Sequence, residues 1–401
     1  MGKTNDLLRG RPPGPPTNRW KVENWVIEMD FGSKVLQFVK KEPVLCISAV
    51  LAAASMAVVP PSAAYVEYID VRVLCLLFCL MGVVAAFQEC GLFNVLAQKL
   101  LAGQKPFRVL CILLVMLPFF TSMLVTNDVA LITFVPFAIL VLELAGRREE
   151  LIRVVVLQTV AANLGSMATP VGNPQNLFLY ARYELGAGEF FGLLLPLVAV
   201  SFVLLLAASA WGGGEAIHIT FPDKAVMSGR KRLVAFGALF VLCLLSVFHV
   251  VHYAVLTAVV VVTLGLISPK LLRQVDYGLL LTFVFFFIFS GNLGQMPAVY
   301  AVLSEMLEKN TLLCSAAVSQ VISNVPAAVL LSGLTEDWQG LLAGVDVGGL
   351  GTPVASLASL ISMKFYMRSE GRNMGRYMLW FTAANVIGLV VLLPLAAVLI
   401  G

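Results

Sequence analysis

Apolar stretches long enough to cross a lipid bilayer follow one another along almost the whole of this 401-residue chain. A spanning helix needs about 20 mainly apolar residues, and apolar stretches occupy 43–59, 71–88, 108–125, 129–145, 151–185, 189–210, 232–249, 253–268, 277–290, 311–333, 338–363 and 377–400. Only 12% of the residues are charged, whereas soluble chains carry about 25%. The chain is therefore predicted to be an all-α polytopic membrane protein, and nucleic-acid binding is excluded.

The distribution of Lys and Arg predicts how these helices are oriented, because cytoplasmic loops are enriched in both residues. If the N-terminus is cytoplasmic and 108–145 and 311–333 each return to the side where they began, 24 of the 27 Lys and Arg residues are cytoplasmic. We therefore interpret both stretches as re-entrant hairpins, with polar tips at Thr126-Asn127-Asp128 and Ser323-Asn324. Pairs of full spans would give the same count, so charge leaves that alternative open. The expected location is a bacterial cytoplasmic (inner) membrane.

Residues 1–42 form a cytoplasmic tail in this interpretation. Within it, Val22, Trp25, Val26 and Met29 recur at helical spacing beside charged residues, a pattern typical of an amphipathic helix in the membrane interface. A tail with little order is the alternative. The seven cysteines lie in or beside apolar stretches, without the spacings of a zinc site or a disulfide framework.

Three motifs recur in the same order in the two parts of the chain. Asp70-Val-Arg-Val returns loosely from Asp276, Thr126-Asn127-Asp128 returns from Ser323, and Ala168-Thr169-Pro170-Val returns as Gly351-Thr352-Pro353-Val. In the predicted topology Asp70 begins a helix from outside and Asp276 begins one from inside, so the two parts would be inverted repeats. Inverted repeats with interrupted helices are typical of secondary transporters.

The repeats divide the chain as follows. The first repeat is 43–210, with scaffold helices in 43–100, a hairpin at 108–145, a broken helix at 151–185 and a helix at 189–210. A cytoplasmic linker occupies 211–231. The second repeat is 232–401, with scaffold helices in 232–290, a hairpin at 311–333, a broken helix at 338–363 and a final helix at 377–400.

Glycine and proline predict where the two broken helices unwind. Pro170, Gly172 and Pro174 interrupt the first, and a glycine-rich run from Gly344 to Pro353 interrupts the second. Lipid cannot satisfy exposed backbone groups, so an unwound segment must lie inside protein or beside a wet cavity. Carbonyl groups freed there can bind a cation, and helix N-termini can face an anion. A purely structural kink is the alternative for either break taken alone.

Two carboxylates fall at these interruptions. Asp128 lies at a hairpin tip, and a charge at the bilayer centre costs about 2.5–3.5 kcal/mol on insertion scales. It is therefore a candidate functional residue, with helix capping as its alternative role. Asp346 lies beside the second break and is a candidate too, unless it simply faces water. An intramembrane aspartyl protease would need a Gly-x-Gly-Asp context, which neither residue has.

The motifs resemble those of the ion transporter superfamily, which includes divalent anion/sodium symporters, citrate-type permeases, arsenite permeases and some sodium/proton antiporters. The resemblance covers most of 43–400 and rests on Thr126-Asn-Asp-Val-Ala-Leu, Asn163-Leu-Gly-Ser-Met-Ala-Thr-Pro-Val-Gly-Asn-Pro-Gln-Asn176, Ser323-Asn-Val-Pro-Ala and Gly349-Leu-Gly-Thr-Pro-Val-Ala-Ser-Leu-Ala358. It implies an elevator mechanism, in which hairpins and broken helices slide against a scaffold, and a homodimer in the lipid.

The same resemblance implies the site residues. Substrate would contact Asn127, Asn173, Asn324, Thr352 and Pro353. A coupling cation such as sodium would contact Thr126, Asn127, Asp128, Thr169, Gly172, Ser323, Asn324 and Gly351. Dicarboxylate symporters carry Ser-Asn-Thr at both tips, whereas this chain has Asp128 and Val325 in the third positions, nearer to the arsenite and antiporter pattern.

The expected function is a permease rather than an enzyme, with no cofactor. It would move a small anion such as a di- or tricarboxylate, coupled to sodium or protons. Because no Lys or Arg is assigned to the membrane interior, helix ends, amide dipoles and bound cations would have to balance that anion. An arsenite-like efflux permease and a sodium/proton antiporter stay open as alternatives.

Overall fold

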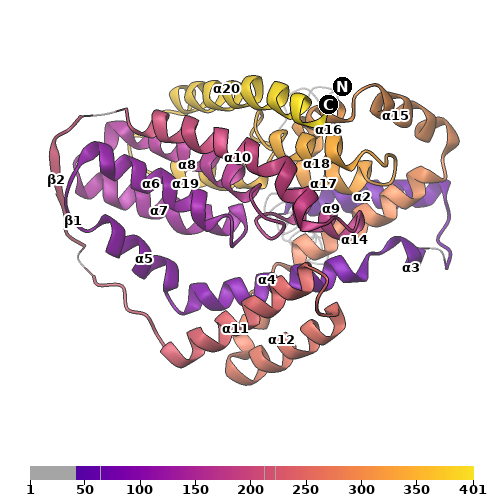
Figure 1. Cartoon of the computed structure of the whole chain (residues 1–401), viewed down its shortest axis with the longest axis horizontal. Helices are drawn as coiled ribbons and strands as arrows, with labels where there is room; N and C mark the ends of the chain where they lie inside the picture. The colour runs from indigo at the N-terminus through magenta and orange to yellow at the C-terminus, as the bar shows by residue number, and fades with distance from the viewer. Residues whose placement is uncertain (1–41, 64, 212, 222) are drawn as a thin grey trace, which may run out of the picture.

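The computed structural model describes residues 42–401 except 64, 212 and 222. The predicted interfacial helix of the tail lies outside these described residues. The described chain is mostly helical (Figure 1), which confirms the prediction of a helical membrane protein.

The helices of the first part follow the predicted apolar stretches closely. α2 (Pro43–Val58), α3 (Tyr65–Tyr68), α4 (Val71–Glu89) and α5 (Leu92–Leu101) come first. Then follow α6 (Phe107–Thr121), α7 (Asn127–Leu144), the short 3-10 helix η1 (Arg148–Glu150), α8 (Leu151–Ser166), α9 (Pro174–Arg182) and α10 (Ala187–Ser209). Both interruptions fall where the sequence predicts them, between α6 and α7 and between α8 and α9.

The second part contains the helices from α11 to α20. It comprises α11 (Arg230–Val247), α12 (Tyr253–Ile267), α13 (Pro269–Leu272), α14 (Tyr277–Gly294), α15 (Pro297–Lys309), α16 (Thr311–Ile322), α17 (Asn324–Leu331), α18 (Trp338–Val347), α19 (Leu357–Arg368) and α20 (Met374–Ile400). The interruptions between α16 and α17 and between α18 and α19 again match the predicted positions. The separate helix α15 was not predicted.

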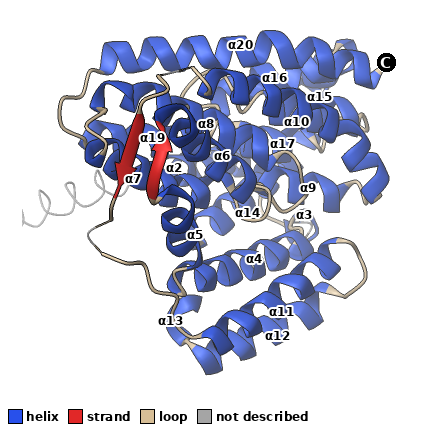
Figure 2. Ribbon diagram, turned by 60° about the vertical axis from the view of Figure 1, so that its left-hand side comes forward, coloured by secondary structure: helices blue, strands red, loops and turns tan. Residues whose placement is uncertain are grey.

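A small antiparallel sheet is the one departure from the all-helical expectation among the described residues. β1 (Gly103–Pro106) pairs with β2 (Ala216–Ile219), with Gly103 opposite Ile219 and Pro106 opposite Ala216. Figure 2 shows the two strands at one end of the molecule. The sheet joins the segment between α5 and α6 to the segment between α10 and α11.

Five of the described helices are long and apolar enough to cross a membrane, judged by length and composition. They span Val71–Glu89, Asn127–Leu144, Ala187–Ser209, Pro269–Gly294 and Met374–Ile400. Shorter apolar helices lie at Val44–Val58, Leu92–Leu101, Phe107–Thr121, Tyr253–Ile267 and Thr311–Ile322. Several elements are therefore too short to span alone, as expected for hairpin arms and broken helices.

Helix α8 lies at the centre of one packed group. All 16 of its residues are buried, including the polar Arg153, Gln158 and Asn163. It packs against α6, α7, α10, α19 and α20, while α16 packs against α17 and α18. A second group is formed by α4 with α11 and α12, and by α2 with α14. The groups meet where α4 contacts α9 and α14 contacts α17.

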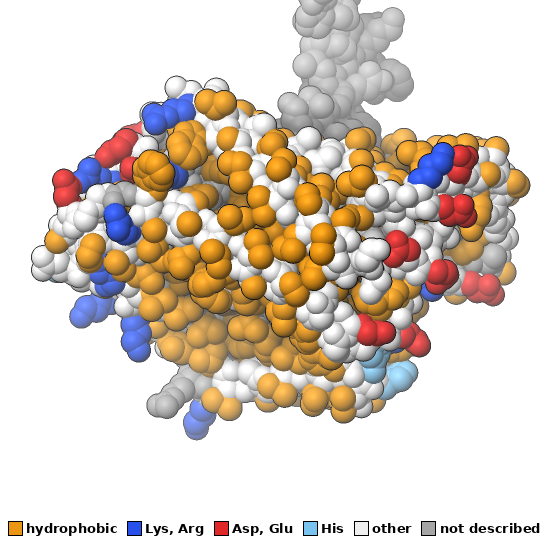
Figure 3. All heavy atoms as spheres, turned by 45° about the horizontal axis from the view of Figure 1, so that its top comes forward, with side chains coloured by type: hydrophobic (Ala, Val, Ile, Leu, Met, Phe, Trp, Pro, Cys, Tyr) orange, Lys and Arg blue, Asp and Glu red, His pale blue; other side chains and the backbone are white. Residues whose placement is uncertain are grey.

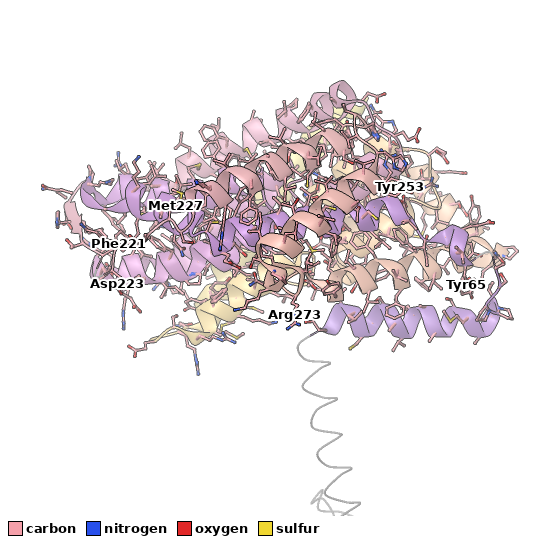
Figure 4. All side chains as sticks on the ribbon, turned by 90° about the horizontal axis from the view of Figure 1, so that it is seen from below. Tyr65, Phe221, Asp223, Met227, Tyr253 and Arg273 are labelled. Carbon is pink, nitrogen blue, oxygen red and sulfur yellow. The ribbon has the colours of Figure 1, made fainter. Side chains whose placement is uncertain are left out.

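The surface separates charge along the long axis of the molecule. Figure 3 shows hydrophobic side chains across the middle, with Lys and Arg gathered mainly at the end that carries β1 and β2 and Asp and Glu mainly at the other. Figure 4 places Phe221, Asp223 and Met227 at the first end and Tyr65 and Tyr253 at the second. Arg273, in another loop that the charge count assigns to the cytoplasm, lies between these two ends.

Candidate functional site

The two hairpin tips make the same contacts with the two helix breaks. The Asn127 backbone N–H donates to the Gly172 carbonyl (3.2 Å), and the Asn324 N–H donates to the Ala355 carbonyl (2.9 Å). The Oδ1 of each asparagine also accepts the next backbone N–H, at 3.0 Å from Asp128 and 2.9 Å from Val325. Each tip is thus fixed on the unwound segment that follows it in the chain.

Threonines hold each break on the preceding hairpin arm. The Thr169 hydroxyl donates to the Met123 carbonyl, and the Thr352 hydroxyl donates to the Gln320 carbonyl (2.9 Å). Both hydroxyl protons are therefore already used within the protein.

Glycines allow the broken helices to approach the hairpin arms closely. A Cβ added at Gly165 would lie 2.7 Å from Ser122 Oγ, and one added at Gly348 would lie 2.8 Å from Ala316 Cα. Gly172 is enclosed by backbone, with Ser122 O only 2.9 Å from an added Cβ and Ser166 O closer still. Gly351 has φ +108°, a conformation that favours glycine, and packs on the Gln320 side chain.

Asn163 on α8 connects the first tip to the second break. Its Oδ1 accepts from Asn127 Nδ2 (3.0 Å) and from the Ser356 hydroxyl (3.1 Å), and its Nδ2 donates to the Gly349 carbonyl (3.4 Å). An added Cβ at Gly349 would lie 2.9 Å from Asn324 Nδ2, so the second tip adjoins the same cluster. The tips predicted to approach each other are therefore joined through one buried set of amides.

Asp346 on α18 makes the corresponding connection from the second part of the chain to the first break. Its Oδ1 accepts from Asn173 Nδ2 (3.2 Å) and Gln175 Nε2 (3.1 Å), at the start of α9. The Asp346 side chain is 3% exposed, so it does not face water as one sequence interpretation allowed. Asn173 also caps α9, since its Oδ1 accepts the Asn176 N–H at 2.8 Å.

A cavity of about 490 Å³ lies between the two packed groups of helices. Leu77, Leu80 and Met81 of α4 line it from one side, together with residues of α2 and α14. The opposite wall includes Thr126, Asp128, Asn173, Val325 and Pro326, and it is completed by Lys364 of α19. The cavity is mainly apolar with a few charged groups, as is common for small-molecule sites.

Asp128 faces this cavity without a partner for its carboxylate among the described residues. The helix-capping alternative is not what the structure shows, because α7 begins after Thr126 without a side-chain cap and Asn127 Oδ1 takes the Asp128 N–H. Lys364, assigned from the sequence to a cytoplasmic loop, lies within α19 and lines the same cavity. The cavity lining therefore contains one basic group, Lys364, and three acidic groups, Asp128, Asp276 and Glu42.

The residues that the sequence analysis selected fall into three places. Thr126, Asp128 and Asn173 line the cavity. Asn127, Ser323 and Asn324 are buried behind its wall, and Ser323 adopts the unusual φ of +76°. The breaks contain the remaining five residues, Thr169, Gly172, Gly351, Thr352 and Pro353. None of these five lines the cavity, and Thr352 is exposed.

Sequence reasoning missed three contributors to this arrangement: Asn163, Gln175 and Lys364. A signal existed for the first, because Asn163 precedes Thr169 by the same spacing as Asp346 precedes Thr352. Gln175 lay inside a quoted motif without an assigned partner. The position of Lys364 on the cavity wall depends on how α19 packs against α7, which no local pattern gives.

Comparison with known proteins gives one family and several relatives. The model of a family described as citrate transporter matches residues 38–339. An uncharacterized transporter of Methanocaldococcus jannaschii is 30% identical over 325 residues, covering 80% of this chain and 88% of that protein. The inner membrane protein YbiR of Escherichia coli is 30% identical over 331 residues, covering 78% of this chain and 86% of its own length.

Proposed function

The chain belongs to the citrate transporter family, and from that premise we propose that it is a secondary transporter that moves a small anion, such as a di- or tricarboxylate, across the membrane. Sodium or protons drive the movement. The proposed setting is a bacterial inner membrane with the N-terminus in the cytoplasm. The basic end of the surface supports this orientation.

The reciprocal contacts of the tips and breaks are the observation that carries this proposal. Asn127 with Gly172 corresponds to Asn324 with Ala355, and Asn163 with Ser356 corresponds to Asp346 with Asn173. The members of each pair lie at equivalent positions of the repeat motifs. This supports two inverted repeats that meet at one site, as in transporters whose interrupted helices bind substrate near the middle of the membrane.

The chemistry of the cavity supports an anionic substrate coupled to a cation. Lys364 supplies a positive charge for a carboxylate, and Asp128 supplies an oxygen ligand for sodium or a proton acceptor. The volume of about 490 Å³ lies within the range of about 300–1,000 Å³ usual for small-molecule sites.

The division of the helices supports an elevator mechanism. The scaffold would consist of α2, α4, α11, α12 and α14, and in a homodimer it would stay fixed. The hairpins and broken helices would slide along it, carrying Asp128 and Lys364 past the wall formed by α4. A cavity between the two groups is where a substrate would be carried.

Uptake into proteoliposomes tests the function. Labelled citrate, succinate and arsenite are offered with a sodium gradient, with a proton gradient and with neither. We expect gradient-driven uptake of a carboxylate, and a loss of at least about tenfold in Lys364→Ala. Lys309→Ala is the control, because Lys309 pairs with Glu305 on the surface (2.7 Å), where such pairs contribute little.

The other outcomes separate the alternatives. Movement of arsenite alone would replace the anion proposal with an efflux permease. Exchange of sodium for protons without any solute would favour an antiporter, which the unpartnered Asp128 carboxylate makes the second candidate. No flux of any kind in protein that is folded and inserted would contradict the transporter function.

A further inference from the structure

The side-chain amide of Gln320, on α16, fills the second break with hydrogen bonds. Its Nε2 donates to the Gly348 carbonyl at 2.8 Å and to the Leu350 carbonyl at 2.9 Å, and the Ala316 carbonyl oxygen lies 3.1 Å from it. Its Oε1 accepts the Thr352 backbone N–H at 2.9 Å. The orientation of the amide follows from these partners, because the reversed amide would set its oxygen against three carbonyl oxygens.

Gly348 and Leu350 lie in the unwound segment after α18, where the helix no longer supplies donors for their carbonyl groups. Both residues are buried, and within the described chain the Gln320 amide is the one donor found for either carbonyl oxygen. Carbonyl oxygens that converge on one point are also the groups with which channels coordinate monovalent cations. The Gln320 nitrogen therefore lies at a point that has the surroundings of a cation site.

The first break has no counterpart of this amide. Met123 occupies the position equivalent to Gln320, because the backbone carbonyl of each accepts the hydroxyl proton of the threonine in its break. The Met123 thioether has no N–H to donate. The Met167 carbonyl, which corresponds in spacing to that of Leu350, accepts no hydrogen bond from the described residues. The first break therefore keeps free a carbonyl whose equivalent is satisfied in the second.

We propose that the Gln320 amide takes the place of a cation in the second break, so that no coupling ion binds there and the first break alone can bind one. The two N–H groups satisfy the freed carbonyls as a bound ion would, and they hold the segment in its unwound form whether or not ions are present. The tips agree with this division, since Asp128 of the first tip is an acid and Val325 of the second is apolar. Gln320 is thus a positioning residue that replaces the cation contact expected at Gly351.

The limit on coupling ions rests on the proposed function, whereas the role of the amide in the second break does not. The test is therefore equilibrium binding of radioactive sodium to the purified full-length chain in nanodiscs, with choline replacing sodium at constant ionic strength. Thermal unfolding is followed in the same buffers, since a ligand that binds the folded state raises Tm. The unmodified protein should bind no more than one sodium ion per chain, and binding of two would overturn the proposal.

Gln320→Glu is the principal variant. It retains the shape of the side chain but sets a carboxylate oxygen against the carbonyl oxygens, so a cation is needed between them. We expect it to bind one sodium ion more per chain than the unmodified protein, and its Tm should rise with sodium by a few degrees more. Gln295→Glu is the matched control, because Gln295 is exposed and its amide contacts the Tyr68 hydroxyl rather than a group of carbonyls. It should bind sodium like the unmodified protein.

Gln320→Met is the second variant and decides the matter if Gln320→Glu does not fold. It places the residue of the first part in the second and removes the donor for both freed carbonyls. Its Tm in choline should be lower than that of the unmodified protein, and sodium should restore part of the loss, because the ion can then bind where the amide was.

The remaining outcomes are decisive as well. Unchanged sodium binding in both variants, or in the one that folds, would overturn the proposal and leave Gln320 as a brace of the fold. So would stabilisation of Gln320→Glu by protons but not by sodium. An additional sodium ion bound by Gln320→Glu, in a protein that transports no solute, would instead uphold the role of the amide and refute the proposed function.

Discussion

Asn163 and Asp346 occupy equivalent positions in the two parts of the chain, yet one is neutral and the other is an acid. Each reaches from the start of its own break to the break of the other part, where Asn163 meets Ser356 and Asp346 meets Asn173. The tips show the reverse distribution, with Asp128 in the first and Val325 in the second. At these two pairs of equivalent positions, each part therefore has one carboxylate. In the first part it is Asp128 at the hairpin tip, and in the second part it is Asp346 beside the helix break.

This difference separates the contacts that hold the site together from the charged groups that could bind a substrate or an ion. The backbone contacts of the tips, the threonine hydroxyls and the closely packed glycines are shared by both parts. The charges are not shared. We call the shared contacts the frame. Substitutions in the frame should therefore have similar effects on transport in the two parts, whereas substitutions of charged groups should have different effects.

The largest expected effect comes from breaking the frame on either side. Gly172→Val and Gly351→Val should each lower transport by at least about a hundredfold in inserted protein, because the new side chain meets the Ser166 backbone or the Gln320 side chain. Transport is measured in proteoliposomes. Gly192→Val is the control, since Gly192 has open space around it. Normal flux in either break variant would mean that its glycine only packs helices.

Removal of the tip charge should change coupling rather than the fold. Asp128→Asn retains the size of the side chain but not its charge, so transport should no longer follow the sodium or proton gradient. Val325→Ala, at the equivalent tip position, should leave the gradient dependence intact. Flux driven by each gradient at several pH values measures this, and intact coupling in Asp128→Asn would remove that carboxylate from the mechanism.

Asn163→Asp and Asp346→Asn exchange the charge at two equivalent helix positions. The two substitutions should change the stability of the folded protein by different amounts. Asn163→Asp replaces the donor to the Gly349 carbonyl with a second acceptor, and leaving a buried group unsatisfied costs about 1–3 kcal/mol. Asp346→Asn gains a donor where unpaired acceptors lie. Thermal unfolding should show a lower Tm for Asn163→Asp than for Asp346→Asn without sodium. An equal Tm in both would show that the two positions are electrostatically alike.

The smallest expected effect concerns the threonines. Thr169→Val and Thr352→Val each remove one hydroxyl-to-carbonyl hydrogen bond, a contribution of about 1 kcal/mol. Thr352 is exposed whereas Thr169 is partly buried, so water can replace the lost bond more easily in the second part. Tm should fall slightly more for Thr169→Val, and a large fall for Thr352→Val would contradict this ordering.

Patterns that depend on local chemistry were recovered from the sequence. Closely spaced prolines and glycines interrupt helices, so the breaks after α8 and α18 were predicted, although single prolines such as Pro136 and Pro196 lie inside continuous helices. Polar residues interrupting an apolar run likewise marked both tips. The division into inverted repeats and domains stays a prediction, which the reciprocal contacts support.

Features that depend on distant partners were not recovered. The strands β1 and β2 have four residues each and pair across more than a hundred residues of chain. The alternation of Ile217, His218 and Ile219 in β2 is a local signal for a strand, but nothing near it in the sequence identifies Gly103–Pro106 as its partner. Asp346 was judged from its neighbours in sequence, whereas Asn173 and Gln175 come from the other part of the chain. Burial of its carboxylate follows from packing alone.

The sheet of β1 and β2 constrains how the two groups of helices can shift. β1 connects α5 to α6, and β2 connects α10 to α11. Because the two strands pair with each other, these two connections lie side by side and are joined by hydrogen bonds. Gly103 (φ +89°) and Gly229 (φ +70°) lie at the outer ends of its two connections and can act as pivots. In the proposed elevator mechanism, a movement of one group past the other would therefore carry both connections together, and Gly103 and Gly229 are positions at which they could bend.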